Sequence, residues 1–391
     1  FRAPHSFTGE DIVEISCHGS LYIQQKIIET LLQAGARMAQ AGEFTQRAFG
    51  NGKFDLSQAE AVADLIASSS KAAHRVAMNQ MRGGFAKQLS VLRDALLQFV
   101  SLIELELDFS EEDVEFANRE KLLELATKIE TDISRLLQSF QLGNAIKNGI
   151  PVAIIGETNA GKSTLLNLLL NEEKAIVSEI HGTTRDVIED TVNIQGIVFR
   201  LIDTAGIRET NDAIETMGIE RTFKKIEQAS IVLWMSDLTT PIEQIEHLAQ
   251  SLAPSLADKQ VIMLFNKSDL LSPEEIQSKL RIFPNLKAER LPISAKKTIN
   301  FDRLQQLLVD AANFPEIGEH DVIVTNLRHY EALKNAQTAI HRVIDGLNSG
   351  ITGDFLSQDI RECMFYLGEI TGQITTDEIL GSIFSKFCIG K

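Results

Sequence analysis

The spacing of apolar residues changes several times along the chain. Apolar and polar residues alternate over Asp11–Ser16, which predicts a strand, and Leu21–Leu32 carries apolar residues at helical spacing. From Ser57 onward apolar positions recur every three or four residues, which predicts an antiparallel helical bundle. Ser57 and Glu60 have the spacing of a capping box at the start of the first bundle helix. The predicted core stripes are Leu89, Leu92, Leu96, Phe99 and Ile103, then Leu122, Ile129, Ile133 and Leu136.

The middle of the chain alternates short apolar runs with helical segments. Several connections between these runs are long enough for parallel crossovers, so residues 148–315 predict a doubly wound α/β domain. Gly196 lies between two β-rich runs, Thr191–Ile194 and Ile197–Ile202, and predicts a hairpin with one antiparallel edge pair. The expected core strands are Val152–Ile155, Ile197–Ile202, Ile231–Met235, Val261–Phe265 and Leu291–Ile293.

Helical spacing returns after Phe314-Pro315, over Leu327–Leu347 and Asp359–Ile370. An α/β module between two helical runs predicts insertion into one bundle whose halves lie on either side of it in sequence. The expected fold class is therefore α/β plus all-α. Its predicted parts are a partial α/β domain at 1–52, a helical domain made of 53–147 and 316–391, and the inserted domain at 148–315.

Charge and cysteine content narrow the class of protein. The chain has 38 Lys and Arg against 54 Asp and Glu, a net charge of −16, so any RNA contact must be local or shared with a partner. Three distant cysteines, Cys17, Cys363 and Cys388, favour reduced thiols and a cytoplasmic location. No apolar run approaches the roughly 18 residues of a membrane helix. Because the first residue is Phe1, we expect the chain to start inside a longer protein, with its first domain incomplete.

A phosphate-binding motif follows the first predicted strand of the α/β domain. The run Val152–Ile155 stops at Gly156, and the pattern Gly156-x-x-x-x-Gly161-Lys162-Ser163 leads into a leucine-rich helix. Glycines let backbone N–H groups close around phosphate oxygens, and the helix N-terminus adds its positive dipole end. Lys162 would reach the β- and γ-phosphates, and the Ser163 hydroxyl would hold Mg²⁺. This pattern is the form of a P-loop.

Four further stretches, each near a strand end, specify a guanine nucleotide. A threonine of Thr183-Thr184 would complete the Mg²⁺ shell, and the aspartate of Asp203–Gly206 would hold Mg²⁺ through water. Asp269, in the run that begins at Asn266, can accept the ring N–H and exocyclic amine of guanine. Ser294-Ala295 would present backbone N–H to the guanine oxygen. An ATPase would leave Asp269 without an explanation.

The position after Asp203–Gly206 is Ile207, which cannot orient an attacking water as glutamine does in Ras-like GTPases. Water positioning must come from elsewhere, and the following loop offers Glu209, Asp212 and Glu215. Developing phosphoryl charge also needs a cation. Because no arginine finger is evident, a monovalent cation held by Asn159 in the P-loop is one source.

With these residues located, the chain resembles the MnmE (TrmE) family of bacterial tRNA modification GTPases along its whole length. The resemblance rests on PHSFTGEDIVEISCHG, NGKFDLSQAEAVADLI, NAGKSTLLN, GTTRD, DTAGIRET, IETMGIERT, NKSD and the terminal FCIGK. It implies a GTP/GDP site formed by Asn159, Ala160, Gly161, Lys162, Ser163, Thr164, Ser178, Glu179, Ile180, His181, Gly182, Thr183, Thr184, Asp203, Thr204, Ala205, Gly206, Asn266, Lys267, Asp269, Ser294 and Ala295.

The resemblance also implies metal sites and catalytic groups. Ser163 and Thr184 would bind Mg²⁺, and Glu215 would orient or activate the attacking water. Cys388 in the terminal motif would matter for tRNA modification. Potassium would be held by Asn159 together with backbone oxygens around Ser178, Ile180 and Thr183.

By the same resemblance, residues 1–52 would belong to a folate-binding and dimerisation domain. Glu14, Lys53 and Lys391 match folate-contacting positions, where a carboxylate can pair with pterin N–H groups and lysines can meet acidic parts of the cofactor. The family forms homodimers and works with the flavoprotein MnmG, which carries FAD. The implied reaction uses GTP hydrolysis, stimulated by K⁺, and a tetrahydrofolate one-carbon unit to modify the wobble uridine of tRNA.

Two other readings of the α/β domain stay open from the residues. A ribosome-assembly G protein would share the nucleotide motifs, but it would typically carry a basic RNA-binding appendage. A self-assembling structural G protein would polymerise through its helices. The chain also departs from the family pattern at Glu157, Thr158 and His181, and the carboxylate of Glu157 near the phosphates would lower nucleotide affinity. His74, His247, His329 and His341 show no ligand spacing and are predicted to be ordinary surface or core residues.

Overall fold

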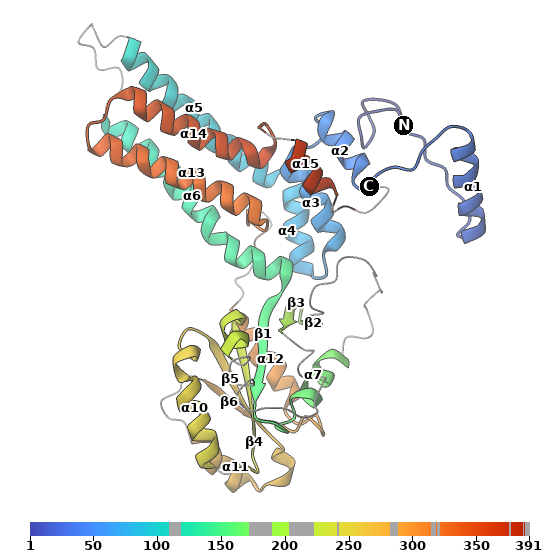
Figure 1. Cartoon of the computed structure of the whole chain (residues 1–391), viewed down its shortest axis with the longest axis vertical. Coiled ribbons are helices and arrows are strands. Elements are labelled where there is room, and N and C mark those ends of the chain that lie inside the picture. The colour runs from blue at the N-terminus through green and yellow to red at the C-terminus, as the bar shows by residue number, and fades with distance from the viewer. Residues whose placement is uncertain are drawn as a thin grey trace. The chain divides into compact units, whose positions relative to one another are not determined.

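The chain divides into two compact units. The computed structural model describes residues 1–108, 119–171, 190–202, 223–240, 242–281, 288–313, 318, 321–374, 377–385 and 387. The first unit contains Phe1–Ser68, Ala73–Gly143 and Gly318–Lys391, and the second contains Ser69–Ala72 and Asn144–Ile317 (Figure 1). The chain therefore leaves the first unit, builds the second and returns, which is the insertion expected from the sequence.

The second unit contains a six-stranded sheet in the order β2-β3-β1-β4-β5-β6. β2 and β3 are antiparallel, and the other neighbouring strands are parallel. Gln195 and Gly196 turn between β2 and β3 with φ angles of 53° and 86°, so the predicted hairpin is confirmed. The strands are β1 (Ile150–Gly156), β2 (Asp190–Ile194), β3 (Ile197–Leu201), β4 (Ile231–Asp237), β5 (Gln260–Asn266) and β6 (Glu289–Pro292).

Helices cover both faces of this sheet. Alternate residues of β1 point to opposite faces: Val152 and Ile154 join one apolar cluster, and Ala153 and Ile155 join the other. The first cluster packs against α7 and α12, and the second against α10 and α11. The sheet is thus buried on both sides, as a doubly wound domain requires. The helices are α7 (Lys162–Asn171), α10 (Ile242–Leu256), α11 (Pro273–Leu280) and α12 (Phe301–Ala312).

The core of the first unit lies among four long helices, two from each side of the insertion. Its fully buried residues include every member of the two predicted stripes. Cys363 belongs to this core, and burial raises the pKa of its thiol to about 12, so it is an inert core residue. The four helices are α5 (Gly84–Asp108), α6 (Arg119–Asn148), α13 (Leu327–Asn348) and α14 (Gly353–Thr371).

Shorter helices complete the first unit. Leu56 and Ala59 of α3 form a small apolar cluster with Phe384 of α15 and with Phe387. No residue of α1 is buried. These helices are α1 (Leu21–Gln33), α2 (Glu43–Gly50), α3 (Leu56–Ala67), α4 (Lys71–Met81) and α15 (Asp377–Phe384).

The strand predicted at Asp11–Ser16 is wrong, because the segment has no regular secondary structure. A strand needs a neighbour that satisfies its backbone groups. Among the described residues this segment exchanges backbone hydrogen bonds only at Ile12, with Phe1, and Val13 remains 86% exposed. Alternation alone therefore did not produce a strand.

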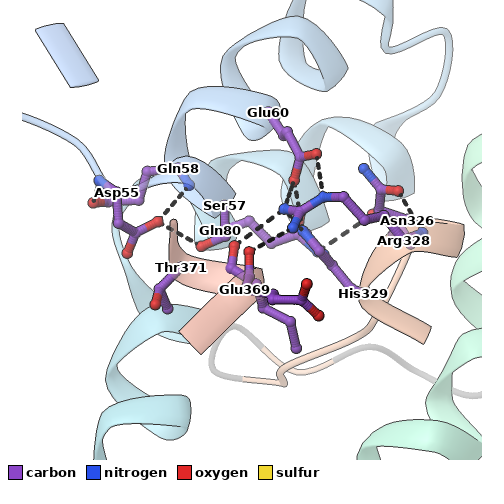
Figure 2. A network of polar contacts seen from close by, with 12 residues as sticks. Asp55, Ser57, Gln58, Glu60, Gln80, Asn326, Arg328, His329, Glu369 and Thr371 are labelled. Carbon is purple, nitrogen blue, oxygen red and sulfur yellow. Dashed lines mark hydrogen bonds and ion pairs between the residues drawn. The ribbon is translucent and has the colours of Figure 1, made fainter. Parts of the chain in front are cut away.

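The predicted capping box is also wrong by two residues. The N-cap of α3 is Asp55, whose carboxylate accepts a hydrogen bond from the Gln58 backbone N–H at 2.8 Å (Figure 2). The Gln58 side chain accepts from the Asp55 backbone N–H at 3.0 Å, and the Ser57 hydroxyl donates to Asp55 at 2.6 Å. Glu60 is thereby free of any capping role and is buried in the helical unit.

Glu60 is the centre of a buried ion cluster that joins three helices (Figure 2). Arg328 of α13 donates to both of its oxygens, at 3.0 and 2.8 Å, and His329 Nε2 lies 2.6 Å from Oε2. Arg328 also donates to the carbonyls of Glu369 and Ile370 at the end of α14, at 2.7 and 3.1 Å. The cluster therefore fixes α3, the start of α13 and the end of α14 against one another.

The charge of Glu60 is set by this cluster. Burial alone raises the pKa of a carboxyl, but the interactions with His329 and Arg328 outweigh it and lower the pKa of Glu60 to about 2. The His329 ring lies 5.2 Å from the Phe85 ring, centroid to centroid, and its Nδ1 has no hydrogen-bond partner among the described residues. Glu60 is therefore ionised in the folded protein at neutral pH.

Candidate functional site

The phosphate-binding loop is held in place by two glycines that no other residue can replace without strain. Gly156 ends β1 with φ +140°, and a Cβ there would lie 2.0 Å from the Met235 carbonyl oxygen. Gly161 has φ +99°, and its Cβ would lie 2.2 Å from Asn266 Nδ2. Both glycines are thus required by the backbone angle and by close approach. The loop between them lies against the ends of β4 and β5.

Lys162 turns its ammonium group into this loop. Its Nζ donates to the carbonyl oxygens of Gly156 at 2.8 Å and Glu157 at 2.5 Å. Burial lowers the pKa of Lys162, repulsion from Lys225 lowers it further, and Glu157 acts in the opposite direction. Ser163 and Thr164 follow in the first turn of α7, where backbone N–H groups point out of the helix end. A cation and a helix N-terminus therefore meet at one point, which suits a phosphate chain.

Asn266 links three stretches that are far apart in sequence. Its Nδ2 donates to the Ala160 carbonyl in the P-loop at 2.8 Å, and its Oδ1 accepts from the Ala295 backbone N–H at 3.0 Å. The Ser268 N–H also donates to the Ile293 carbonyl at 3.0 Å. The P-loop, the turn after β5 and the loop after β6 thus form one cluster at the carboxyl edge of the sheet, where ligands of doubly wound domains bind.

Asp269 lies in a short 3-10 helix, Ser268–Leu270, next to this cluster. Hydrogen bonds from Ser294 and Lys297 hold the pKa of its carboxyl below the usual range. Lys297 Nζ lies 3.1 Å from Asp269 Oδ2. A carboxylate kept ionised at this position can accept two N–H groups of a base. Lys297 was not predicted, because nothing in its sequence position signals a partner for Asp269.

Asn159 stands at the open side of the P-loop. Its backbone is in the left-handed region, with φ +64°, and its side chain is exposed. An exposed amide oxygen at that point is able to ligate a cation, as proposed from the sequence. Among the residues that the structure describes, no group of three or more His, Cys, Asp or Glu side chains is arranged to hold a metal.

Many predicted site residues lie outside the described residues and stay predictions. They include both candidate catalytic groups, Glu215 and Cys388, and the predicted residues of the loops after α7 and β3. These positions are Ser178, Glu179, Ile180, His181, Gly182, Thr183, Thr184, Asp203, Thr204, Ala205, Gly206, Glu209, Asp212, Glu215, Cys388 and Lys391.

Two of the three predicted folate positions line one pocket in the first unit. The pocket has a volume of 440 Å³, and its lining includes Glu14, Lys53, Phe7 and His5. Lys53 Nζ donates to the Pro4 carbonyl at 2.7 Å, which ties the end of α2 to the first residues of the chain. The structure thus brings Lys53 to a pocket that also contains a carboxylate and an aromatic ring from the first 14 residues.

Comparisons with known proteins point to one family along the whole chain. The family model described as the MnmE helical domain matches residues 56–388, and the one described as the GTP-binding protein TrmE N-terminus matches residues 1–53. The tRNA modification GTPase MnmE of Bacteroides thetaiotaomicron is 64% identical over all of this chain and 85% of its own length. The proteins of the same name from Bacteroides fragilis and Flavobacterium johnsoniae are 62% and 53% identical, over 85% and 84% of their lengths.

Solved structures resemble parts of the chain at lower similarity. An Era variant of Aquifex aeolicus shares 29% identity over 48% of this chain and 65% of its own, with a TM-score of 0.31. The G domain of T. maritima FeoB shares 23% identity over 42% of this chain and 99% of its own, with a TM-score of 0.29.

No helix among the described residues is long and apolar enough to cross a membrane. On its sequence relatives and both family models, the chain belongs to the MnmE family of tRNA modification GTPases.

Proposed function

We propose that this chain is the K⁺-dependent GTPase that works with the flavoprotein MnmG in the cytoplasm. Together they would place an aminomethyl-type group on C5 of the tRNA wobble uridine, using a tetrahydrofolate one-carbon unit. Family membership makes the chain a GTP hydrolase of tRNA modification. The observation that carries the finer proposal is the presence, in one chain, of the nucleotide cluster around Asn266 and the pocket that contains Glu14 and Lys53.

The nucleotide is positioned by the described residues in three ways. Lys162 and the N–H groups at the start of α7 hold the phosphates, because a positive charge and the N-terminus of a helix converge there. Asp269 accepts the two N–H groups on the edge of guanine. Asn266 holds the loops that carry these groups in a fixed relation, so the phosphate and base subsites stay aligned.

Hydrolysis needs charge neutralisation and an oriented water. Ser163 and Thr184 would hold Mg²⁺, which would offset the negative charge of the phosphates. Asn159 and backbone oxygens near Ser178, Ile180 and Thr183 would hold K⁺, and Glu215 would orient the water. Two such domains would pair across a homodimer, and this pairing would stimulate hydrolysis.

The potassium assignment is tested by steady-state GTP hydrolysis in KCl and NaCl at equal ionic strength, so that screening is constant. We expect the rate in KCl to be at least about tenfold higher, an electrostatic effect of the size seen when one stabilising group is removed. Asn159→Ala should lose this stimulation. Asn144→Ala, an exposed helical position, is the matched control and should keep it. Equal rates for the parent protein in the two salts would refute the potassium site.

The folate assignment is tested by calorimetric binding of a tetrahydrofolate derivative. Glu14→Gln should weaken binding at least about tenfold, because the amide cannot accept two pterin N–H groups. Glu29→Gln on α1, an exposed carboxylate paired with Lys26, is the control. Binding that is unchanged by Glu14→Gln, or weakened equally by both variants, would exclude this pocket.

A further inference from the structure

Asp237 is a buried carboxylate at the end of the most deeply buried strand of the sheet. All seven residues of β4 are buried, and Asp237, the last of them, is 8% exposed. In the parallel ladder it lies opposite Asn266 of β5. A buried carboxylate is costly unless it is paired and hydrogen-bonded. The hydrogen-bond partners of the Asp237 carboxylate therefore indicate its role.

Its two oxygens have different partners. Oδ1 accepts from the backbone N–H and the hydroxyl of Thr239, at 2.8 and 2.7 Å, which closes the turn after β4. Oδ2 forms a short ion pair with Lys267 Nζ. Burial by itself raises the pKa of Asp237, but the bonds from Lys267 and Thr239 outweigh it and lower the pKa. The ionised group thus joins the turn after β4 to the turn after β5.

The pair determines where the side chain of Lys267 lies. Lys267 sits between Asn266 and Asp269, with a left-handed backbone at φ 63° and ψ 31°. Its ammonium group pairs with Asp237, yet 36% of its side chain stays exposed. A lysine whose charged end is fixed presents its methylene stem as an apolar surface. Lys267 directly follows Asn266, whose side chain contacts the P-loop at Ala160 and the loop after β6 at Ala295.

We propose that Asp237 is a positioning residue of the guanine-nucleotide site. It fixes the stem of Lys267 as the surface against which the purine ring packs, while Asp269 reads the edge of the ring. The flat ring and the extended stem gain dispersion contacts only if the stem stays in place. The inference deepens the proposed nucleotide site and rests on the assignment of guanine to Asp269.

A purely structural role for Asp237 predicts a different result. Asp237 also closes the turn at Thr239, and Lys279 stabilises the same turn by donating to the carbonyls of Leu238 and Thr240. If turn stability were the whole effect, removing Lys279 would resemble removing Asp237. If Asp237 acts through Lys267, its effect must disappear once Lys267 has lost its ammonium group.

The test uses the full chain and GDP binding by calorimetry. Asp237→Asn should weaken GDP binding about tenfold, the size of one charge-assisted contact. Binding of inorganic pyrophosphate, measured by competition, should stay within about twofold because it has no base. In GTP hydrolysis the loss should fall on KM rather than on kcat. An equal loss for GDP and pyrophosphate would overturn the proposal.

A double-mutant cycle then shows whether Asp237 acts through Lys267. Lys267→Met should weaken GDP binding by a similar factor, and Asp237→Asn with Lys267→Met should be no worse than Lys267→Met alone. Lys279→Met is the matched control and should bind GDP like the parent protein. Additive losses, or an equal loss in the control, would contradict the proposal. If Asp237→Asn does not fold, Lys267→Met alone must give the same result: weaker binding of GDP with nearly unchanged binding of pyrophosphate.

The outcome is distinguishable from failure of the nucleotide site itself. If Asp269→Asn exchanges guanine for xanthine preference while Asp237→Asn binds GDP like the parent protein, only the role of Asp237 is wrong. If Asp269→Asn keeps its preference for guanine, the base site is wrong, and with it the surface proposed for Lys267.

Discussion

Each unit of the molecule contains a buried carboxylate paired with a basic side chain, but the two pairs differ in what they leave exposed. In the helical unit, Glu60 holds Arg328 and His329, whose side chains are 23% and 2% exposed. In the sheet unit, Asp237 holds Lys267, whose side chain is 36% exposed. In the first cluster, Arg328 also donates hydrogen bonds to two backbone carbonyls at the end of α14. The second keeps a lysine stem available to a ligand.

This difference separates a structural role from a binding role. Removing Glu60 leaves largely buried cationic groups without their carboxylate, so the cost appears in stability. Removing Asp237 frees a lysine that can reach water, so the cost should appear mainly in ligand affinity. The predictions below follow that distinction.

The largest effect is expected for Glu60→Gln. Arg328 and His329 lose their carboxylate, and the end of α14 loses a charged anchor, so the free energy of unfolding should fall by about 3–5 kcal/mol. Chemical denaturation followed by helix content measures this loss. The control is Glu104→Gln, which removes an exposed pair with Arg361 and should cost less than about 1 kcal/mol. Equal stability of the two variants would contradict the enclosed cluster.

The same cluster predicts a pH dependence. The pKa of Glu60 is lowered to about 2, from an ordinary value of 4.5, so its stabilisation is complete above pH 4.5 and is lost as the pH falls toward 2. The stability gap between the parent protein and Glu60→Gln, on the order of 3 kcal/mol, should shrink across this window. Urea midpoints at about pH 6 and pH 3 measure the gap, and a gap independent of pH would show that Glu60 does not titrate with folding.

The smallest effect is expected for Lys297→Met. Lys297 is 59% exposed, and its pair with Asp269 is therefore screened by water. Guanine competes with this lysine for the carboxylate, so the variant should bind GDP slightly more tightly, by less than about fivefold. Calorimetry measures the change. A large loss of affinity would mean that Lys297 contacts the nucleotide rather than competing with it.

The sequence predicted the parts of the site that depend on local patterns. The P-loop is recognisable because Gly156 and Gly161 are needed for backbone angles within a short segment, and the bundle stripes follow from helical spacing. The hairpin at Gly196 is equally local.

Features that depend on distant partners were not predicted. Glu60 was assigned to a cap, whereas its partners are Arg328 and His329, more than 260 positions away. In the sequence, Asp237 resembles any polar residue at the end of a strand, and only the ladder shows that it lies opposite Asn266. Alternation at Asp11–Ser16 indicated a strand, but pairing decides whether one forms. Long-range contacts, rather than local preference, account for each of these differences.

The proposed nucleotide site recognises guanine through Asp269, next to the P-loop that Asn266 holds. Its most direct measurement compares the binding of GDP and xanthosine diphosphate to the parent protein and to Asp269→Asn. The amide offers a donor where the carboxylate accepted one, so the variant should lose affinity for GDP and gain it for the xanthine nucleotide, reversing the preference. A variant that still prefers GDP would contradict the account.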